Sequence, residues 1–158
     1  MRTALKNILV TVRLLVLCSV AMAAQAPSPE DQLAAAEAKW AANKPTVYEF
    51  TLKMICFCPP PPPGTSGAEP IVFRVENGVG SLTWAWADRP QARQGLEKYS
   101  TVENQFAFIR AELAKRPYRA EIEYDDLGYP RRVYIDPKPN VADEEYGFEV
   151  QGFTTLVR

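Results

Sequence analysis

Apolar and polar residues alternate along six stretches of the chain, and this period of two predicts strands with one buried face. The apolar positions of these stretches are Tyr48, Phe50, Leu52 and Met54; Ile71, Phe73 and Val75; Leu82, Trp84 and Trp86; Tyr118, Ala120, Ile122 and Tyr124; Val133 and Ile135; and Tyr146, Phe148 and Val150. Between the second and third stretches, Asn77-Gly78 predicts a type I′ hairpin turn, because both residues tolerate positive φ. Gly152 predicts a bulge in the last strand, since the apolar positions shift to Phe153 after it.

Two further stretches place apolar residues at helical spacing. The first helix is predicted to have Ser28 as N-cap, Pro29 in its first turn and Asn43 at its end. The second begins with Ser100-Thr101-Val102-Glu103, the sequence of a capping box, and ends at Arg116-Pro117. The positions expected to face the core are Leu33 and Trp40 in the first helix and Val102, Phe106, Ile109 and Leu113 in the second. Residues 88–99 are polar and contain proline and glycine, so they predict a loop.

The predicted elements follow in the order helix and three strands, then again helix and three strands. Connections between successive strands are too short for parallel crossovers, so we expect antiparallel pairing within each unit. Two helices on one face of the sheet would give an α+β fold. We therefore expect a single domain over residues 24–158 with two α-β-β-β halves, at about 28–87 and 100–157. The halves share no letter-by-letter repeat, so the repetition is one of architecture.

The first residues of the chain have the features of a secretory signal. Arg2, Lys6 and Arg13 carry positive charge, an apolar run follows over residues 14–20, and Ala21-Met22-Ala23 has the small residues of a cleavage site. The apolar run is shorter than the roughly 20 residues of a membrane-spanning helix. A lipid anchor on Cys18 is disfavoured, because Leu17 stands where that motif requires a small residue. We expect residues 1–23 to be removed and the protein to be exported, to the periplasm or outside the cell, with no integral membrane segment remaining.

Composition narrows the function of the mature chain. Loss of the signal lowers the count of Lys and Arg from 18 to 15 against 19 acidic residues, so the net charge falls to near −4. A mildly acidic chain without a basic stripe argues against nucleic acid as a partner. The chain contains no histidine. Its absence excludes Ser-His-Asp and Cys-His catalysis and every metal site that uses histidine.

Cys56 and Cys58 are the two cysteines of the mature chain, and an oxidising compartment raises the question of a disulfide. In a regular strand residues i and i+2 lie about 6.6 Å apart, whereas a disulfide needs Cβ atoms about 4 Å apart. A disulfide, or a metal ion shared by both thiolates, therefore requires a bend at Phe57. A strained disulfide, two packed thiols, a metal site and a redox pair remain open. Two cysteines fill only half of a tetrahedral metal site, so we predict no metal and no cofactor.

Two loops carry weaker candidate sites. The run Pro59, Pro60, Pro61, Pro62 and Pro63 predicts a polyproline segment that could dock into an aromatic groove or simply form a stiff loop. Oxygen-bearing side chains gather in a second loop, at Asp136, Asn140, Asp143, Glu144 and Glu145. Calcium binds such groups, but the spacing fits no EF-hand, and a solvated acidic loop is the simpler interpretation.

Several motifs together resemble the exported bacterial proteins grouped as domain of unknown function 6174. They are the aromatic strand that leads into Cys56-x-Cys58-Pro59, the hairpin Asn77-Gly78-Val79, the helix start Thr101-Val102-Glu103-x-x-Phe106, the turn Tyr124-Asp125-x-x-Gly128-Tyr129-Pro130 and the acidic step Asp143-Glu144-Glu145. The resemblance spans about residues 40–153 and implies export, but no activity. At the level of topology, the order of elements is also similar to PepSY-like and β-lactamase-inhibitor-like domains, which bind other proteins.

These observations predict an exported, non-enzymatic module of the bacterial cell envelope that binds another exported protein. The alternative is a thiol-dependent metal-binding or redox protein that uses Cys56 and Cys58. No catalytic residue is assigned, and an enzyme with paired carboxylates remains open, because the sequence does not show the distances between acidic side chains.

Overall fold

A computed structural model describes residues 26–56, 70–83 and 95–156. Its elements, in chain order, are α1 (Pro29–Asn43), β1 (Val47–Cys56), β2 (Ile71–Glu76), β3 (Val79–Thr83), the short 3-10 helix η2 (Glu97–Tyr99), α3 (Val102–Ala114), β4 (Arg119–Tyr124), β5 (Pro130–Asp136) and β6 (Tyr146–Thr155). The signal predicted at residues 1–23, Cys58, the proline run 59–63 and the tryptophans Trp84 and Trp86 lie outside the described residues.

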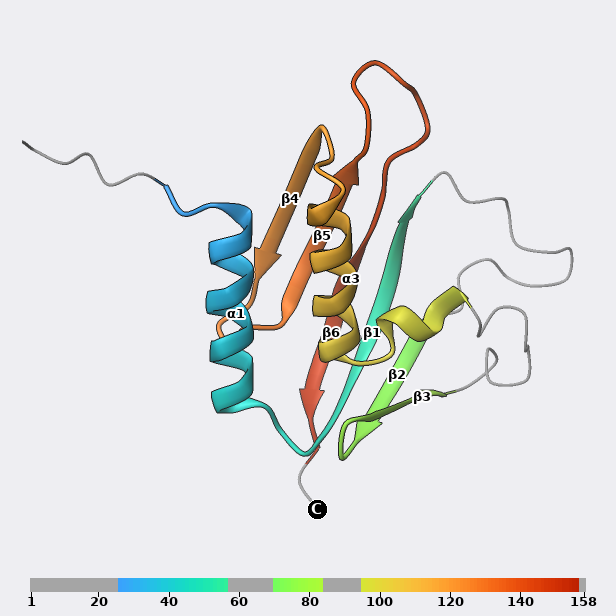
Figure 1. The fold of residues 1–158 in the computed structure, drawn as a ribbon. Coiled ribbons are helices and arrows are strands. Elements are labelled where there is room, and N and C mark those ends of the chain that lie inside the picture. Colours follow the sequence, from blue (N-terminus) through green and yellow to red (C-terminus); the bar gives the residue numbers. More distant parts are fainter. Residues whose placement is uncertain (1–25, 57–69, 84–94, 157–158) are drawn as a thin grey trace, which may run out of the picture.

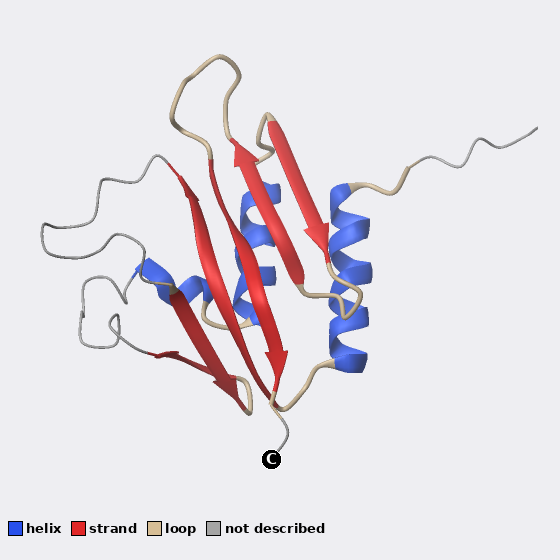
Figure 2. Cartoon of the chain, turned by 180° about the vertical axis from the view of Figure 1, so that it is seen from behind, coloured by secondary structure: helices blue, strands red, loops and turns tan. Residues whose placement is uncertain are grey.

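The six strands form one antiparallel sheet in the order β3-β2-β1-β6-β5-β4. The two longest strands, β1 and β6, pair at its centre and join the two groups of strands. Both α-helices lie on the same face of the sheet (Figures 1 and 2). The predicted α+β fold, with an antiparallel sheet and two helices, is confirmed. That the halves are true structural repeats, and that they are related to PepSY-like domains, stays a prediction.

The core lies between the helices and the inward face of the sheet, as the alternation of apolar residues predicts. On β1, Tyr48, Phe50 and Leu52 are buried, and the intervening residues are more exposed. The predicted helix stripes are buried as well: Leu33 and Trp40 on α1, and Val102, Phe106, Ile109 and Leu113 on α3. Aromatic rings meet edge to face or stacked across this core, for example Trp40 on Tyr48 with ring centroids 5.3 Å apart.

The ends of α1 match the prediction, but the start of α3 does not. Ser28 and Asp31 form a capping box at α1, with Pro29 in the first turn. At α3 the N-cap is Thr101, whose Oγ1 accepts a hydrogen bond from the N–H of Asn104. The predicted capping box at Ser100 is wrong, because the chain becomes helical one residue later and the carboxylate of Glu103 binds groups on α1 instead.

The hairpin turn and the bulge form at the glycines that predicted them. Asn77 and Gly78 have φ of 51° and 80°, as a type I′ turn requires, and join β2 to β3. Gly152 has φ of 58°, and the register between β1 and β6 shifts by one residue beside it, which confirms the predicted bulge. Between Gly95 and Ser100, the predicted loop instead forms helical turns that bury Tyr99 against Phe108 and Phe148.

Candidate functional site

The face of the sheet opposite the helices carries the candidate site. In Figure 2 the strands lie in front of α3, α1 stands beside β4 at the border of the sheet, and no helix of the described ranges crosses in front of the strands. Because side chains alternate along a strand, the residues between the core positions point to this face. The pairing of β4 with β5 and β6 brings charged residues together there.

One row of this face alternates in charge across four strands. The residues that stand opposite one another in this row are Glu123 of β4, Arg132 of β5, Glu149 of β6 and Lys53 of β1. The Nζ of Lys53 lies 3.4 Å from Oε2 of Glu149, and Nη1 of Arg132 lies 3.9 Å from Oε1 of Glu123. Gln151 adds a hydrogen bond of 3.1 Å from its Nε2 to Oε2 of Glu149. Opposite charges on neighbouring strands stabilise the sheet modestly and fix the side chains.

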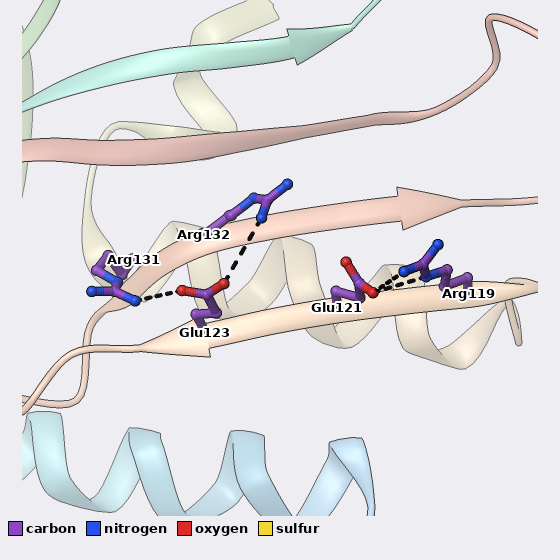
Figure 3. Close-up of polar contacts among 5 residues, drawn as sticks. All are labelled: Arg119, Glu121, Glu123, Arg131 and Arg132. Carbon is purple, nitrogen blue, oxygen red and sulfur yellow. Dashed lines mark hydrogen bonds and ion pairs between the residues drawn. The ribbon is translucent and has the colours of Figure 1, made fainter.

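Glu123 is the residue that holds two arginines at the edge of this row (Figure 3). Its Oε2 accepts a hydrogen bond from Nη2 of Arg131, and its Oε1 faces Arg132. On the same strand, Arg119 donates to Glu121 from Nε at 2.8 Å and also from Nη2. Hydrogen bonds to these carboxylates raise the pKa of Arg119 and of Arg131, so both side chains stay charged. The five residues of Figure 3 carry a net charge of +1.

These side chains surround a shallow, open hollow of about 300 Å³. It is lined by Glu123, Arg131, Arg132, Glu149, Val150 and Gln151. Within the part of the chain that the structure describes, no hydrogen bond engages the guanidinium of Arg132, whose side chain is 43 % exposed. Arg132 can therefore donate hydrogen bonds to a polar group of a partner that enters the hollow, and Glu149 can accept them.

A second polar cluster lies on the helix side, around the buried carboxylate of Glu112. Oε2 of Glu112 on α3 accepts a hydrogen bond of 2.5 Å from the hydroxyl of Tyr146 and one of 2.8 Å from Nζ of Lys115. Burial, followed by the bond to Glu112, raises the pKa of Tyr146. Each oxygen of the carboxylate has a donor, so we interpret this cluster as a link between α3 and the start of β6. Sequence reasoning missed it, although Glu112 falls within the apolar stripe of α3, where a charged residue signals a buried partner.

The acidic loop does not gather its oxygen atoms around one point. Asn140 and Asp143 adopt positive φ of 62° and 67°, and Oδ1 of Asp136 accepts a hydrogen bond from the N–H of Lys138. Within the described residues, no three side chains of the types His, Cys, Asp or Glu lie close enough together to hold a metal ion. Side chains in this loop thus take part in turns, and a calcium site there gains no support from the geometry.

Of the two candidate cysteines, only Cys56 falls within the described residues. It is the last residue of β1 and stands opposite Tyr146 of β6, so the pairing with β6 is regular from Thr51 to this point. Any bend would begin at Phe57, which lies outside those residues, as do Cys58 and the proline run. The disulfide, the thiol site and the docking loop stay predictions.

Comparison with known proteins identifies the family of the chain. No curated protein and no solved structure matches it significantly. Among the described helices, none is long and apolar enough to cross a membrane. The model of one family, described as a family of unknown function (DUF6174), matches residues 32–155, which include the hairpin, the helix start and the glycine turn that carried the resemblance. The match covers most of the chain, and the protein therefore belongs to the DUF6174 family.

Proposed function

We propose that this protein is a non-enzymatic binding module of the bacterial cell envelope and that it binds another exported protein through the helix-free face of its sheet. The observation that carries the proposal is the charged row from Glu123 to Lys53, which is held in register by four strands and remains open to solvent. Export itself rests on the signal predicted at residues 1–23.

The arrangement of this face suits a protein surface. Charged groups of both signs stand at fixed positions, and such patterns set the orientation and specificity of a protein partner more than its affinity. The hollow is shallow and open, and most of its lining residues are charged, unlike the enclosed and mostly apolar pockets that bind small molecules. Its lining carries two arginines and two glutamates. A matching partner therefore presents both acidic and basic side chains.

The proposal is tested with baits that differ only in charge at this face. Mature protein, the double variant Arg131→Gln/Arg132→Gln and a control double variant Lys39→Gln/Arg116→Gln are each immobilised and exposed to the envelope fraction of the native cells. Lys39 and Arg116 lie on α1 and just after α3 and are exposed, so the control removes the same charge away from the sheet face. Recovered proteins are identified by mass spectrometry, and the dissociation constant is then measured with each purified candidate.

We expect one partner to bind the wild-type protein and the control equally and the Arg131/Arg132 variant about tenfold more weakly. Recovery of the same proteins, with equal dissociation constants, by all three baits would contradict the use of this face. Turnover of a substrate by the purified protein, abolished by one polar substitution, would contradict the non-enzymatic role.

A further inference from the structure

The outer edge of β4 is a free edge of the sheet. β4 is the terminal strand and pairs only with β5. A terminal strand leaves every second backbone N–H and C=O without a strand partner, and such an edge can pair with another chain. Natural edges are blunted by proline, by bulges, by charged side chains or by a covering element, and β4 carries charged side chains at Arg119, Glu121 and Glu123. Residues 119–124 (RAEIEY) contain no proline or glycine, and the register shift of this pair leaves the run Arg119 to Glu123 regular.

Two contacts show which backbone groups of β4 point outward. The N–H of Asp125 donates to the carbonyl of Tyr129, so the backbone N–H and C=O of Asp125 point toward β5. Because backbone groups alternate in direction along a strand, those of Glu123 and Glu121 point toward β5 as well. The carbonyl oxygen of Val133 on β5 lies against Gly147 of β6, so the backbone N–H and C=O of Val133 point toward β6 and away from β4. Since Ile122 stands opposite Val133, its backbone groups do not meet a partner on β5.

Ala120 and Ile122 therefore direct their N–H and C=O groups to the open edge. Tyr118 precedes the strand and departs from the alternation, with its N–H bonded to the carbonyl of Pro137. Among the turns, loops and caps of the described residues, no backbone hydrogen bond uses the groups of Ala120 or Ile122. The side chains of these two residues lie on the helix side and are partly exposed, and Tyr118 beside them is 64 % exposed.

The position of α1 decides what can occupy this edge. α1 packs over β4 on the helix side and lies at this border of the sheet (Figures 1 and 2). If β4 of a second copy paired here in the antiparallel direction, both copies of α1 would lie on the same side of the joined sheet. Neighbouring strands are about 4.8 Å apart, whereas two helices need about 8–10 Å between their axes. An antiparallel second copy is thus excluded by α1, while a single extended segment is not.

We infer that the edge of β4 binds an extended peptide segment of the protein partner as an added strand. This inference rests on the proposed binding function and names its mode. Backbone hydrogen bonds to Ala120 and Ile122 would supply affinity, and alternate side chains would supply specificity. Side chains on the helix side of the added strand are apolar and cover Ile122 and Tyr118. Those on the open face are charged, with basic residues opposite Glu121 and Glu123 and an acidic residue opposite Arg119.

The probe is the synthetic peptide acetyl-Thr-Lys-Val-Lys-Val-Glu-Val-amide, titrated into the ¹⁵N-labelled mature protein. In the free protein we expect the amides of Ala120 and Ile122 to exchange with solvent faster than those of Glu121 and Glu123, which bond to β5. Saturation with the peptide protects Ala120 and Ile122. A peptide with every Lys and Glu exchanged binds more weakly, because it places acidic residues opposite Glu121 and Glu123.

The matched variants are Ala120→Pro and Ala120→Val. Proline removes the outward N–H without removing a bond to β5 and is tolerated at an edge, whereas valine keeps the N–H. We expect Ala120→Pro to bind the peptide about tenfold more weakly and Ala120→Val to bind like the wild type. If circular dichroism shows that Ala120→Pro is unfolded, the same loss is sought with a peptide N-methylated at the residues that face β4.

Three outcomes overturn the inference. They are no protection of Ala120 and Ile122 by the peptide at millimolar concentration, equal binding of the peptide by the two folded variants, and equal binding of the N-methylated and unmodified peptides. The natural partner separates this inference from the proposed function. If Ala120→Pro binds that partner normally while the Arg131/Arg132 variant does not, the face binds the partner without strand addition. If the wild-type bait recovers no partner, the proposed function fails, and the peptide experiment still decides whether the edge accepts a strand.

Discussion

At the scale of single residues, Gly147 is required by the closeness of β5 and β6. A Cβ atom built on Gly147 would lie 1.8 Å from the carbonyl oxygen of Val133 and 2.8 Å from its carbonyl carbon. These atoms belong to the backbone of the neighbouring strand and cannot move aside as a flexible side chain would. Any side chain at this position must therefore push the two strands apart, at the centre of the charged half of the sheet.

Gly147→Ala is expected to lower the free energy of unfolding by about 3 kcal/mol, because overpacking against a fixed backbone forces the strands to shift. Urea denaturation followed by circular dichroism measures the change. Gly95→Ala is the matched control: a Cβ there meets no atom within 4 Å, so stability should change by less than about 0.5 kcal/mol. Equal effects of the two substitutions would show that β5 and β6 are less closely packed than described.

At the scale of secondary structure elements, Glu103 links the two helices. Its Oε1 accepts a hydrogen bond of 3.0 Å from the indole N–H of Trp40 and one of 3.1 Å from Nζ of Lys44. Burial tends to raise the pKa of the Glu103 carboxyl, but the bonds from Trp40, from its own backbone and from Lys44 outweigh it and lower the pKa. The N-terminus of α3 is thereby attached to the C-terminal half of α1.

Glu103→Ala is expected to lower the free energy of unfolding by about 1 kcal/mol at pH 7, because it leaves the buried N–H of Trp40 without its acceptor. A lowered carboxyl pKa gives stability that is present above the ordinary pKa and is lost as the pH falls through the folded value. The difference between wild type and variant should therefore shrink below about pH 4. Urea denaturation at pH 7, 5 and 3 measures it.

Asp126→Asn serves as the control for this substitution, since the carboxylate of Asp126 is fully exposed and lies 3.8 Å from Nζ of Lys39. An exposed pair of this kind contributes little. A pH-independent difference between wild type and Glu103→Ala would assign the effect to packing alone.

The elements were predictable from sequence where their signals are local. The alternation on β1, the cap at Ser28 and the turn at Asn77-Gly78 each depend on residues close in the chain. By contrast, Thr101 is the cap in place of Ser100, and Glu103 accepts its hydrogen bond from Trp40, a residue far away in sequence. The charged row on the open face was not predictable either. It depends on the register between strands, and that register pairs β1 with β6 from opposite ends of the chain.

At the scale of the whole molecule, the core contains several tyrosines whose hydroxyl groups resist ionisation. Burial, with the charge of Glu112 nearby, raises the pKa of Tyr99 to about 12, and burial with Asp125 raises that of Tyr129 to about 12. The pKa values of Tyr48 and Tyr146 are raised as well, chiefly by burial. In the unfolded chain a tyrosine ionises near pH 10. Folding therefore keeps these hydroxyl groups protonated in a pH range where the tyrosines of the unfolded chain ionise.

The protein should lose stability as the pH rises above about 10. A tyrosine whose pKa is higher in the folded protein than in the unfolded chain contributes stability. This contribution is complete below the pKa of the unfolded chain and is lost as the pH rises toward the pKa of the folded protein. Thermal unfolding between pH 8 and 11.5 measures the loss, and in a Tyr118→Phe variant, which lacks the exposed Tyr118, the absorbance of tyrosinate near 295 nm should rise together with unfolding. Tyr146→Phe should lose less stability over this range than the wild type. In the Tyr118→Phe variant, an early rise of tyrosinate absorbance while the near-ultraviolet circular dichroism remains native would contradict the burial of these groups.

The pairing of β1 with β6 has a consequence for how the chain reaches its folded state. The first and last described strands, β1 and β6, are neighbours at the centre of the sheet, and the hairpins β2-β3 and β4-β5 are attached to them through β2 and β5. Contacts between distant parts of a chain slow folding, because the intervening segment must be ordered before they are made. Until β6 has been synthesised and brought to β1, the two hairpins have no common sheet. Cooperative folding of this protein is thus a late event, one that depends on its last strand.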